Sequence, residues 1–488
     1  MQHNYSPLFA AIEQTKTKND CLTHETTDNP CVDLFFSINA ARGMDEQTLF
    51  GLFSKAFDAN AEDALKILFY SRDIRQGQGE RNTFKVLIAK MTDQAAMRIA
   101  LADNISKIPI YGRWDDLFAF IGTPLENNAL ACIRDALNRG DSLCAKWMPR
   151  EKSSKKAIAR KIMTAMNLSP KAYRKMLSRL TNVVETKMCS KDWDNIIFRS
   201  VPSLAMRNYR KAFEKNCTTW EPYISSLLSG EETVNASVLY PHDIVRKYFP
   251  LMNDWDLGVS NVDTLLEEQW KALPNYLNGE NMILPVVDTS GSMYSGMSED
   301  GFSPIIASLA LGMYISERNK GPFKDHFVTF SVEPQVQQIE GNNLHEKLLA
   351  LKKAEWGYNT DLSNVFNTIL DSAVANNVDP KHMPTQILIL SDMEFDRACS
   401  NGNSVTAYDY ARTKYRQAGY NLPEIIFWNL NSSGKNNPVK FNETGTALVS
   451  GFSPVILKQI LSSKELTPES IMRDVIDSER YSQISLPL

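Results

Sequence analysis

The feature that most constrains the fold is an alternation of strand-like and helix-like segments from about Asn281 to the C-terminus. Three apolar runs are rich in β-branched residues, as strands buried on both faces are: ILPVV (Ile283–Val287), QILIL (386–390) and EIIFW (424–428). Apolar residues at helical spacing follow Ser303 and Asp361 and recur over Ala407–Gln417. This alternation predicts a doubly wound, mostly parallel sheet over residues 280–488, with a C-terminal helix. The segments HFVTFSV and PQVQQIE indicate two further strands.

The chain before residue 280 has a different pattern. Residues 1–40 read as a polar lead-in segment, and residues 41–275 carry apolar residues at helical steps, such as Leu49, Phe53 and Phe57. These steps predict an all-α domain of stacked short helices. The sequence contains no strict repeat that would distinguish a HEAT-like helical repeat from an irregular stack. The predicted fold class is therefore an all-α region followed by an α/β domain.

The composition argues against several classes of protein. The seven cysteines are scattered and form no CxxC pair, which disfavours a disulfide framework or a structural zinc site. No apolar run approaches the roughly 20 residues that span a bilayer, and the N-terminus lacks the pattern of a secretory signal. We therefore expect a cytoplasmic protein without a membrane role.

Five oxygen-bearing side chains follow or flank these predicted elements. Asp288, Ser290 and Ser292 come directly after the first apolar run, Thr360 precedes a predicted helix, and Asp392 follows the run 386–390. Ligands of doubly wound sheets bind beyond the C-terminal ends of the strands. Oxygen ligands that include few carboxylates suit Mg²⁺. The spacing therefore predicts a magnesium site.

Together these residues resemble the metal-ion-dependent adhesion site of a von Willebrand factor A domain. The resemblance rests on the DxSxS motif in VVDTSGSM, a threonine before a helix and a later strand-end aspartate. The loop around Thr360 reads GYNTD where many relatives have GGT, which puts the shape of that loop in doubt. The resemblance implies that a partner's acidic group completes the coordination. The competing interpretation is that Ser290 and Ser292 cap a helix and Asp392 ends a strand.

A basic stretch covers residues 141–215. It holds 18 Lys or Arg and 6 Asp or Glu, a net charge of +12, and since the whole chain carries −4 the rest carries −16. Concentrated cations are typical of polyanion sites, and Trp147, Tyr173 and Trp193 are candidates for stacking on bases. The candidate RNA-binding residues are Lys152, Lys155, Lys156, Arg160, Lys161, Arg174 and Lys175. The alternative is a solvated basic face, or one that docks against the acidic remainder.

Two further stretches combine arginine with glycine or aspartate: RDIRQGQGER (72–81) and YGRWDDLF (111–118). A loop that bends at Gly77 and Gly79 could approach a phosphate. We favour a structural role instead, in which Arg72 or Arg113 pairs with a nearby aspartate and holds neighbouring helices together.

These stretches, with KWMPRE (146–151), VPSLAMRNY (201–209), VVDTSGSM and DSERYSQI (477–484), resemble the domain-of-unknown-function family 2828 from about residue 33 to the end of the chain. The resemblance implies a helical N-terminal region and a von Willebrand A-like C-terminal domain. The layout is also similar to that of the TROVE-module proteins of the Ro type. In those proteins a ring of helical repeats binds RNA and a von Willebrand A-like domain closes the ring.

The sequence thus favours a non-enzymatic RNA-binding scaffold with a Mg²⁺-dependent adhesion site for an acidic partner group. The alternative is a protein–protein adhesion module that acts through the metal site and has no nucleic-acid role. A metal-dependent nuclease or phosphatase is disfavoured, since the predicted site lacks the clustered carboxylates that would hold two ions. An ATPase is unsupported, because no GxxxxGK[ST] loop is present.

Overall fold

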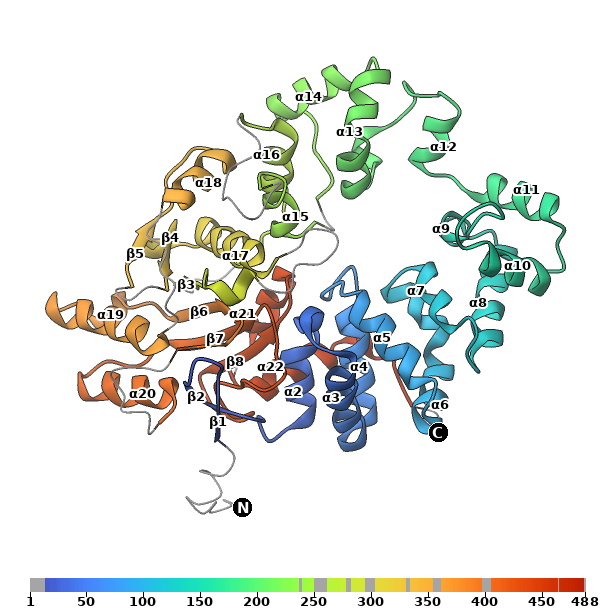
Figure 1. Ribbon diagram of the computed structural model, residues 1–488. Coiled ribbons are helices and arrows are strands. Elements are labelled where there is room, and N and C mark those ends of the chain that lie inside the picture. Colours follow the sequence, from blue (N-terminus) through green and yellow to red (C-terminus); the bar gives the residue numbers. More distant parts are fainter. Residues whose placement is uncertain are drawn as a thin grey trace. The chain divides into compact units, whose positions relative to one another are not determined.

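The computed structural model describes residues 14–236, 239–249, 261–277, 282–294, 303–330, 334–353, 361–396, 405–463 and 465–486 (Figure 1). The chain divides into two compact units. One, here called the sheet unit, contains Met1–Ile67 and Tyr240–Ser478. The other, the helical unit, contains Leu68–Leu239 and Glu479–Leu488. Within the described ranges, no helix is both long and apolar enough to cross a membrane.

A six-stranded sheet in the order β5-β4-β3-β6-β7-β8 forms the centre of the sheet unit. All of its neighbouring strands pair in parallel except β4 and β5, which are antiparallel at one edge. The strands are β3 (Ile283–Val287), β4 (His326–Thr329), β5 (Val336–Gln338), β6 (Gln386–Ser391), β7 (Glu424–Asn429) and β8 (Thr446–Ser450). The predicted mostly parallel, doubly wound sheet is confirmed, and β8 is a strand that the sequence analysis did not identify.

Helices cover this sheet, and the predicted ones after Ser303, after Asp361 and near Ala407 are present. Helix α17 approaches β3 so closely that a Cβ on Gly312 would lie 2.5 Å from Cγ2 of Val287. The helices of this part of the chain are α15 (Pro241–Val245), α16 (Thr264–Lys271), α17 (Pro304–Arg318), α18 (Leu344–Lys353), α19 (Leu362–Ala375), α20 (Ala407–Gln417), α21 (Leu457–Ser462) and α22 (Pro468–Ile476). Short 3-10 turns lie at η5 (Gly291–Tyr294), η6 (Gly321–Phe323), η7 (Pro380–His382) and η8 (Pro454–Ile456).

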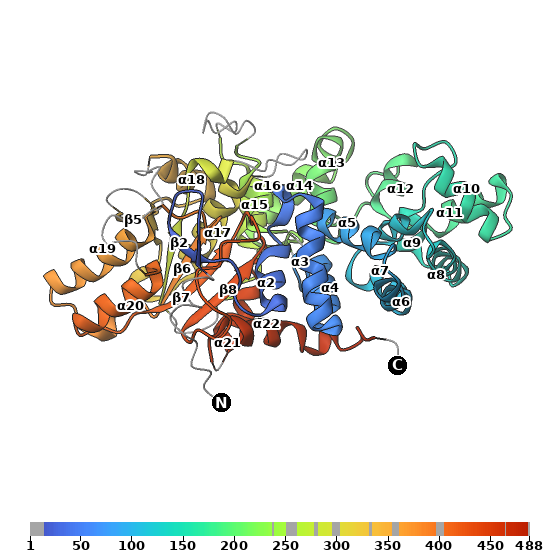
Figure 2. The same cartoon turned by 60° about the horizontal axis from the view of Figure 1, so that its bottom comes forward.

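Residues 14–38 belong to the sheet unit and form regular structure instead of a polar lead-in. They form a hairpin of β1 (Gln14–Lys16) and β2 (Leu22–His24), followed by α2 (Pro30–Ile38), which lies beside β8 (Figure 2). Ser450 Oγ donates to the carbonyl of Phe35 at 2.8 Å and fixes this contact. Seven of the nine residues in PCVDLFFSI are buried, and only Pro30 and Asp33 are partly exposed. Next come η1 (Ala41–Gly43), α3 (Glu46–Ala59) and α4 (Ala61–Arg72).

The helical unit is all-α within the residues described, as predicted. Its elements are α5 (Asn82–Met91), α6 (Ala95–Asn104), η2 (Ile105–Lys107), α7 (Ile108–Tyr111), η3 (Trp114–Phe120), α8 (Glu126–Asn138), α9 (Ser142–Trp147), α10 (Lys156–Ala165), α11 (Pro170–Leu180), α12 (Val184–Cys189), η4 (Phe198–Ser200), α13 (Ser203–Asn216), α14 (Trp220–Ser229) and η9 (Glu479–Tyr481). The C-terminal turn η9 is held here because Arg480 forms two hydrogen bonds with Asp73, at 2.8 and 3.0 Å. The compact units therefore follow other boundaries than the predicted domains 41–275 and 280–488.

Candidate functional site

The ends of β3 and β6 bring the predicted aspartates to one edge of the sheet. The two strands pair in parallel, with Val287 opposite Leu390, so the residues that follow them emerge together. The backbone N–H of Asp288 donates to the carbonyl of Leu390 at 3.0 Å. Ser391 Oγ donates to Oδ2 of Asp288 at 2.5 Å. This contact orients the Asp288 carboxylate, and Asp392 follows directly.

The two predicted serines lie at the same edge. The backbone N–H of Ser290 donates to Oδ1 of Asp288 at 2.9 Å, which turns the chain back over the strand end. The hydroxyls of Ser290 and Ser292 are 3.1 Å apart. A hydrogen bond from Ser292 reaches the Asp392 carboxylate and acts to lower its pKa. Two carboxylates and two hydroxyls therefore converge.

Both carboxylates are buried at a cost. Asp288 is 0% exposed and Asp392 is 2% exposed. Burial raises the pKa of Asp288, and burial together with the charge of Asp288 raises the pKa of Asp392 to about 7. Within the described residues, neither carboxylate forms an ion pair. A cation bound between the two carboxylates would offset the cost of burying their charge.

The donor set fits a hard dication. Four of the five predicted ligands, Asp288, Ser290, Ser292 and Asp392, supply oxygen atoms at one place. Thr360 lies outside the described residues, and Asp361, which follows it, caps the N-terminus of α19. Among the described residues, no group of three or more His, Cys, Asp and Glu side chains could hold a metal ion, so such a site would depend on hydroxyl ligands. Sequence reasoning missed Ser391, although its place opposite the end of β3 was available from the strand pattern.

Most of the candidate RNA-binding residues are exposed, and one of them, Lys161, forms a salt bridge. Lys156 and Arg160 on α10 are exposed. Lys161 forms a salt bridge with Glu126 at 2.6 Å, and no other basic candidate pairs with an acid among the residues described. The further exposed candidates are Lys152 and Lys155, which precede α10, and Arg174 and Lys175 on α11.

The proposed aromatic platforms are largely unavailable. Tyr173 is 1% exposed and donates from its hydroxyl to the carbonyl of Pro149 at 3.2 Å, so its assignment to base stacking was wrong. Trp147 is half-buried, and the guanidinium of Arg113 lies 4.0 Å from its ring centroid. Trp193 is half-buried. The basic stretch therefore offers charge more than stacking.

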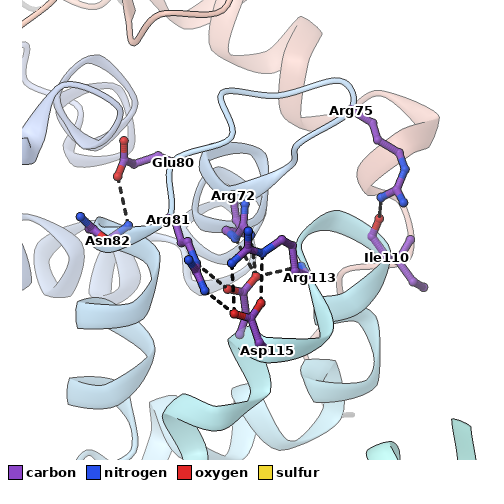
Figure 3. Close-up of polar contacts among 9 residues, drawn as sticks. Arg72, Arg75, Glu80, Arg81, Asn82, Ile110, Arg113 and Asp115 are labelled. Atoms are coloured by element: carbon purple, nitrogen blue, oxygen red, sulfur yellow. Dashed lines mark hydrogen bonds and ion pairs between the residues drawn. The ribbon is translucent and has the colours of Figure 1, made fainter. Parts of the chain in front are cut away.

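The arginine-rich turns form a structural network, as the favoured interpretation held (Figure 3). Arg72, 2% exposed, contacts Oδ2 of the fully buried Asp116 at 2.7 and 2.8 Å. Arg113 contacts Oδ1 of Asp115 at 3.0 Å, and Arg81 pairs with the same aspartate. These arginines hold helices of the helical unit together.

Two family models match adjacent parts of the chain. A domain of unknown function, DUF2828, matches residues 17–97 and 140–281, and a second, DUF7788, matches residues 282–484. An uncharacterized protein of Acanthamoeba polyphaga mimivirus is 29% identical in an alignment that covers 94% of this chain and 87% of that protein. The crystal structure of the Ro (RSR) protein of Deinococcus radiodurans aligns over 90% of this chain and 93% of that chain, at 16% identity. Its TM-score of 0.38 is too low to support an inference about fold or function.

The sequence predicts a resemblance to family 2828 that reaches the end of the chain. The family model matches only as far as residue 281, and a different family model matches the residues that follow. Residues 17–97 and 140–281 match the domain-of-unknown-function family 2828, as the sequence predicted, and residues 282–484 match family 7788.

Proposed function

We propose that this protein is a non-enzymatic binding scaffold whose sheet unit holds Mg²⁺ at Asp288, Ser290, Ser292 and Asp392. The observation that carries the proposal is the convergence of two buried carboxylates with two hydroxyls at the paired ends of β3 and β6. Mg²⁺ takes six oxygen ligands and keeps several waters. Four side chains leave positions open for water, for Thr360 and for an acidic group of a partner.

Binding is favoured over catalysis by what surrounds the carboxylates. Asp288 accepts hydrogen bonds at both oxygens, from Ser290 N–H and from Ser391 Oγ, so it is oriented rather than free to take a proton from a substrate. Two-metal hydrolysis needs more carboxylates than the two that converge here among the residues described. The site is therefore suited to capture an anionic group.

The cation site is tested by Mg²⁺ titration of the full chain in a calorimeter. We expect one saturable site per chain, lost in Asp288→Asn. The matched control is Asp371→Asn, which changes a carboxylate of the same unit that is 66% exposed and pairs with Lys414. Absence of saturable binding at millimolar Mg²⁺, or equal loss in both variants, would refute the proposal.

The helical unit supplies a second binding surface, which we assign to the phosphate backbone of RNA. The specific observation is that Lys152, Lys155, Lys156 and Arg160 are exposed and pair with no acid among the residues described. Cations on neighbouring turns can replace the counterions of several phosphates, and such binding tolerates sequence changes and weakens with salt.

The RNA surface is tested by gel shift with structured RNA. Reversing Lys152, Lys155, Lys156 and Arg160 to glutamate is expected to abolish the shift. The control reverses four exposed cations of the sheet unit, Lys320, Lys324, Arg416 and Lys458, which gives the same change in net charge. An equal loss of RNA binding in the two sets would mean that net charge alone controls binding, and it would refute the assignment of the surface. An unchanged shift in the first set would refute the RNA surface and favour the alternative function, a protein-adhesion module. For that alternative, chelation of Mg²⁺ should release a bound partner that nuclease does not remove.

A further inference from the structure

The turn of the N-terminal hairpin, residues 17–21, docks on the loop that follows Asp392. Thr17 Oγ1 donates to the carbonyl of Phe395 at 2.6 Å, and this bond is buried. Asn19 Nδ2 donates to the carbonyl of Glu394 at 3.1 Å. Asp20 and Asp396 form an isolated antiparallel bridge. The turn thus restrains three successive residues, from Glu394 to Asp396, that are more than 370 positions away in the sequence. Figure 2 shows the hairpin, in dark blue, beside the sheet.

The side chain of Glu394 extends this docking contact toward the cation site. Its Oε2 accepts from the backbone N–H of Lys18 at 3.0 Å, and its Oε1 lies 3.6 Å from Lys18 Nζ. The carboxylate is only 4% exposed. On its other side, the backbone N–H of Glu394 donates to Oδ1 of Asp392 at 3.2 Å. A continuous series of contacts therefore leads from the hairpin turn through Glu394 to a predicted ligand.

The turn also lies near Asp361, the N-cap residue of α19. Cys21 is 5% exposed, and its backbone N–H donates to Thr17 Oγ1 at 3.1 Å. Burial raises the pKa of the Cys21 thiol to about 12, and the charges of Asp361 and Asp396 add to the increase. Asp361 directly follows the predicted ligand Thr360. The thiol is therefore close to residues from two of the loops that are expected to form the cation site.

The loop after β6 has a conformation that needs such support. Met393 has a φ of +63°, in the left-handed region that residues other than glycine occupy at a cost. The backbone N–H of Met393 donates to Ser391 Oγ at 3.1 Å, and Ser391 in turn holds Asp288. Release of Glu394 and Phe395 from the hairpin would remove restraints on the C-terminal side of Met393 and allow it to relax. Asp392 would then move with the loop.

We propose that the hairpin turn, residues 17–21, is a positioning element of the cation site, and that its docking on residues 394–396 and cation binding at Asp392 stabilise one another. This inference rests on the proposed Mg²⁺ site. It assigns a role to a segment outside the β3 and β6 loops. Because coupling between two equilibria is reciprocal, cation binding should tighten the docking by the same factor by which docking tightens cation binding.

The first test removes one docking hydrogen bond, together with the bond that Cys21 N–H donates to the same hydroxyl, without changing side-chain volume. Thr17→Val in the full chain is expected to weaken Mg²⁺ binding about tenfold in calorimetry. A tenfold change is expected if the whole free energy of one buried hydrogen bond is lost from cation binding. The matched control is Thr23→Val. Thr23 lies in the same hairpin, is equally buried, and donates to the carbonyl of Asn437 at 2.9 Å instead of to the site loop. Thr17→Ser, which keeps the hydroxyl, should restore the affinity.

The second test measures the reciprocal effect on the unchanged protein. Alkylation of Cys21 by iodoacetamide, followed by peptide mass spectrometry, reports undocking of the turn. We expect Mg²⁺ to slow alkylation of Cys21 about tenfold. Alkylation of Cys31, which is buried in α2, and of Cys189, which is exposed in the helical unit, should not change.

The outcomes separate this inference from the function on which it rests. A protein that binds no Mg²⁺ refutes both. A protein that binds Mg²⁺ with equal affinity in Thr17→Val and Thr23→Val, or whose Cys21 reacts equally fast with and without Mg²⁺, keeps the cation site and refutes the role of the hairpin.

Discussion

Removal of the buried carboxylate of Asp116 should open the helical unit. Asp116 is fully buried and is the only acid within salt-bridge distance of Arg72 among the residues described. It also accepts the backbone N–H of Arg113 at 2.8 Å. In Asp116→Ala the guanidinium of Arg72 remains buried without a counter-charge, close to the charges of Arg81 and Arg113. Breaking such a pair costs about 3–5 kcal/mol.

Hydrogen exchange of the full chain, read by mass spectrometry over residues 68–120, can measure this loss of stability within the helical unit. A loss of about 3–5 kcal/mol corresponds to an increase of roughly 10²- to 4 × 10³-fold in the opening constant. The control is Asp135→Ala, because Asp135 pairs with Arg134 at 3.0 Å in the same unit while both side chains are about half exposed. Exposed pairs contribute about 0–1 kcal/mol. Equal effects of the two substitutions would refute the assignment of this network to fold stability.

Three other predictions concern the surface, the cation site and the core. Replacing Lys152, Lys155, Lys156 and Arg160 with alanine, which removes four charges without reversing them, should reduce the slope of log K against log salt for single-stranded RNA by about 3, since each phosphate contact contributes about 0.7. Binding titrations at several salt concentrations would measure this slope. Mg²⁺ should raise the melting temperature more at pH 8 than at pH 6. Burial raises the pKa of Asp392 to about 7, whereas the same carboxyl titrates near pH 4 in the unfolded chain. Between about pH 4 and pH 7 the cation-free folded protein therefore keeps a proton that the unfolded chain has lost, and its stability falls as the pH rises through this window. At pH 8 the carboxylate is charged in both states, so a bound Mg²⁺ adds more stability there than at pH 6. Gly312→Ala should lower the unfolding free energy by about 1–3 kcal/mol in denaturant titrations, because its Cβ would press on Val287, whereas Gly51→Ala in α3, where the space is open, should raise it by up to about 1 kcal/mol.

The strand-end part of the candidate site was predictable because it depends on local rules. Buried parallel strands are apolar over their whole length, and the residues after β3 and β6 must meet when those strands are neighbours. The burial of Tyr173 was not predictable, since an aromatic residue among lysines has the same local sequence whether it faces the core or the solvent. Helix α2 was missed because it is nine residues long and seven of them are buried, so few polar residues mark its exposed side. The contacts of Thr17 with Phe395 depend on tertiary packing, which no local pattern encodes.

The boundary between the two family matches at residues 281 and 282 differs from the boundary of the compact units, and the packing of α2 explains why. Strand β8 ends the sheet, and α2 buries Leu34, Phe35 and Phe36 beside it. The side chain of Asn39 adds a buried hydrogen bond to Ser450 Oγ at 3.2 Å. A chain limited to the second family match would expose the apolar surface that α2 covers, and it would also lack the hairpin turn. Residues that match family 2828 therefore complete the core of the sheet unit and, under our proposal, the support of its cation site.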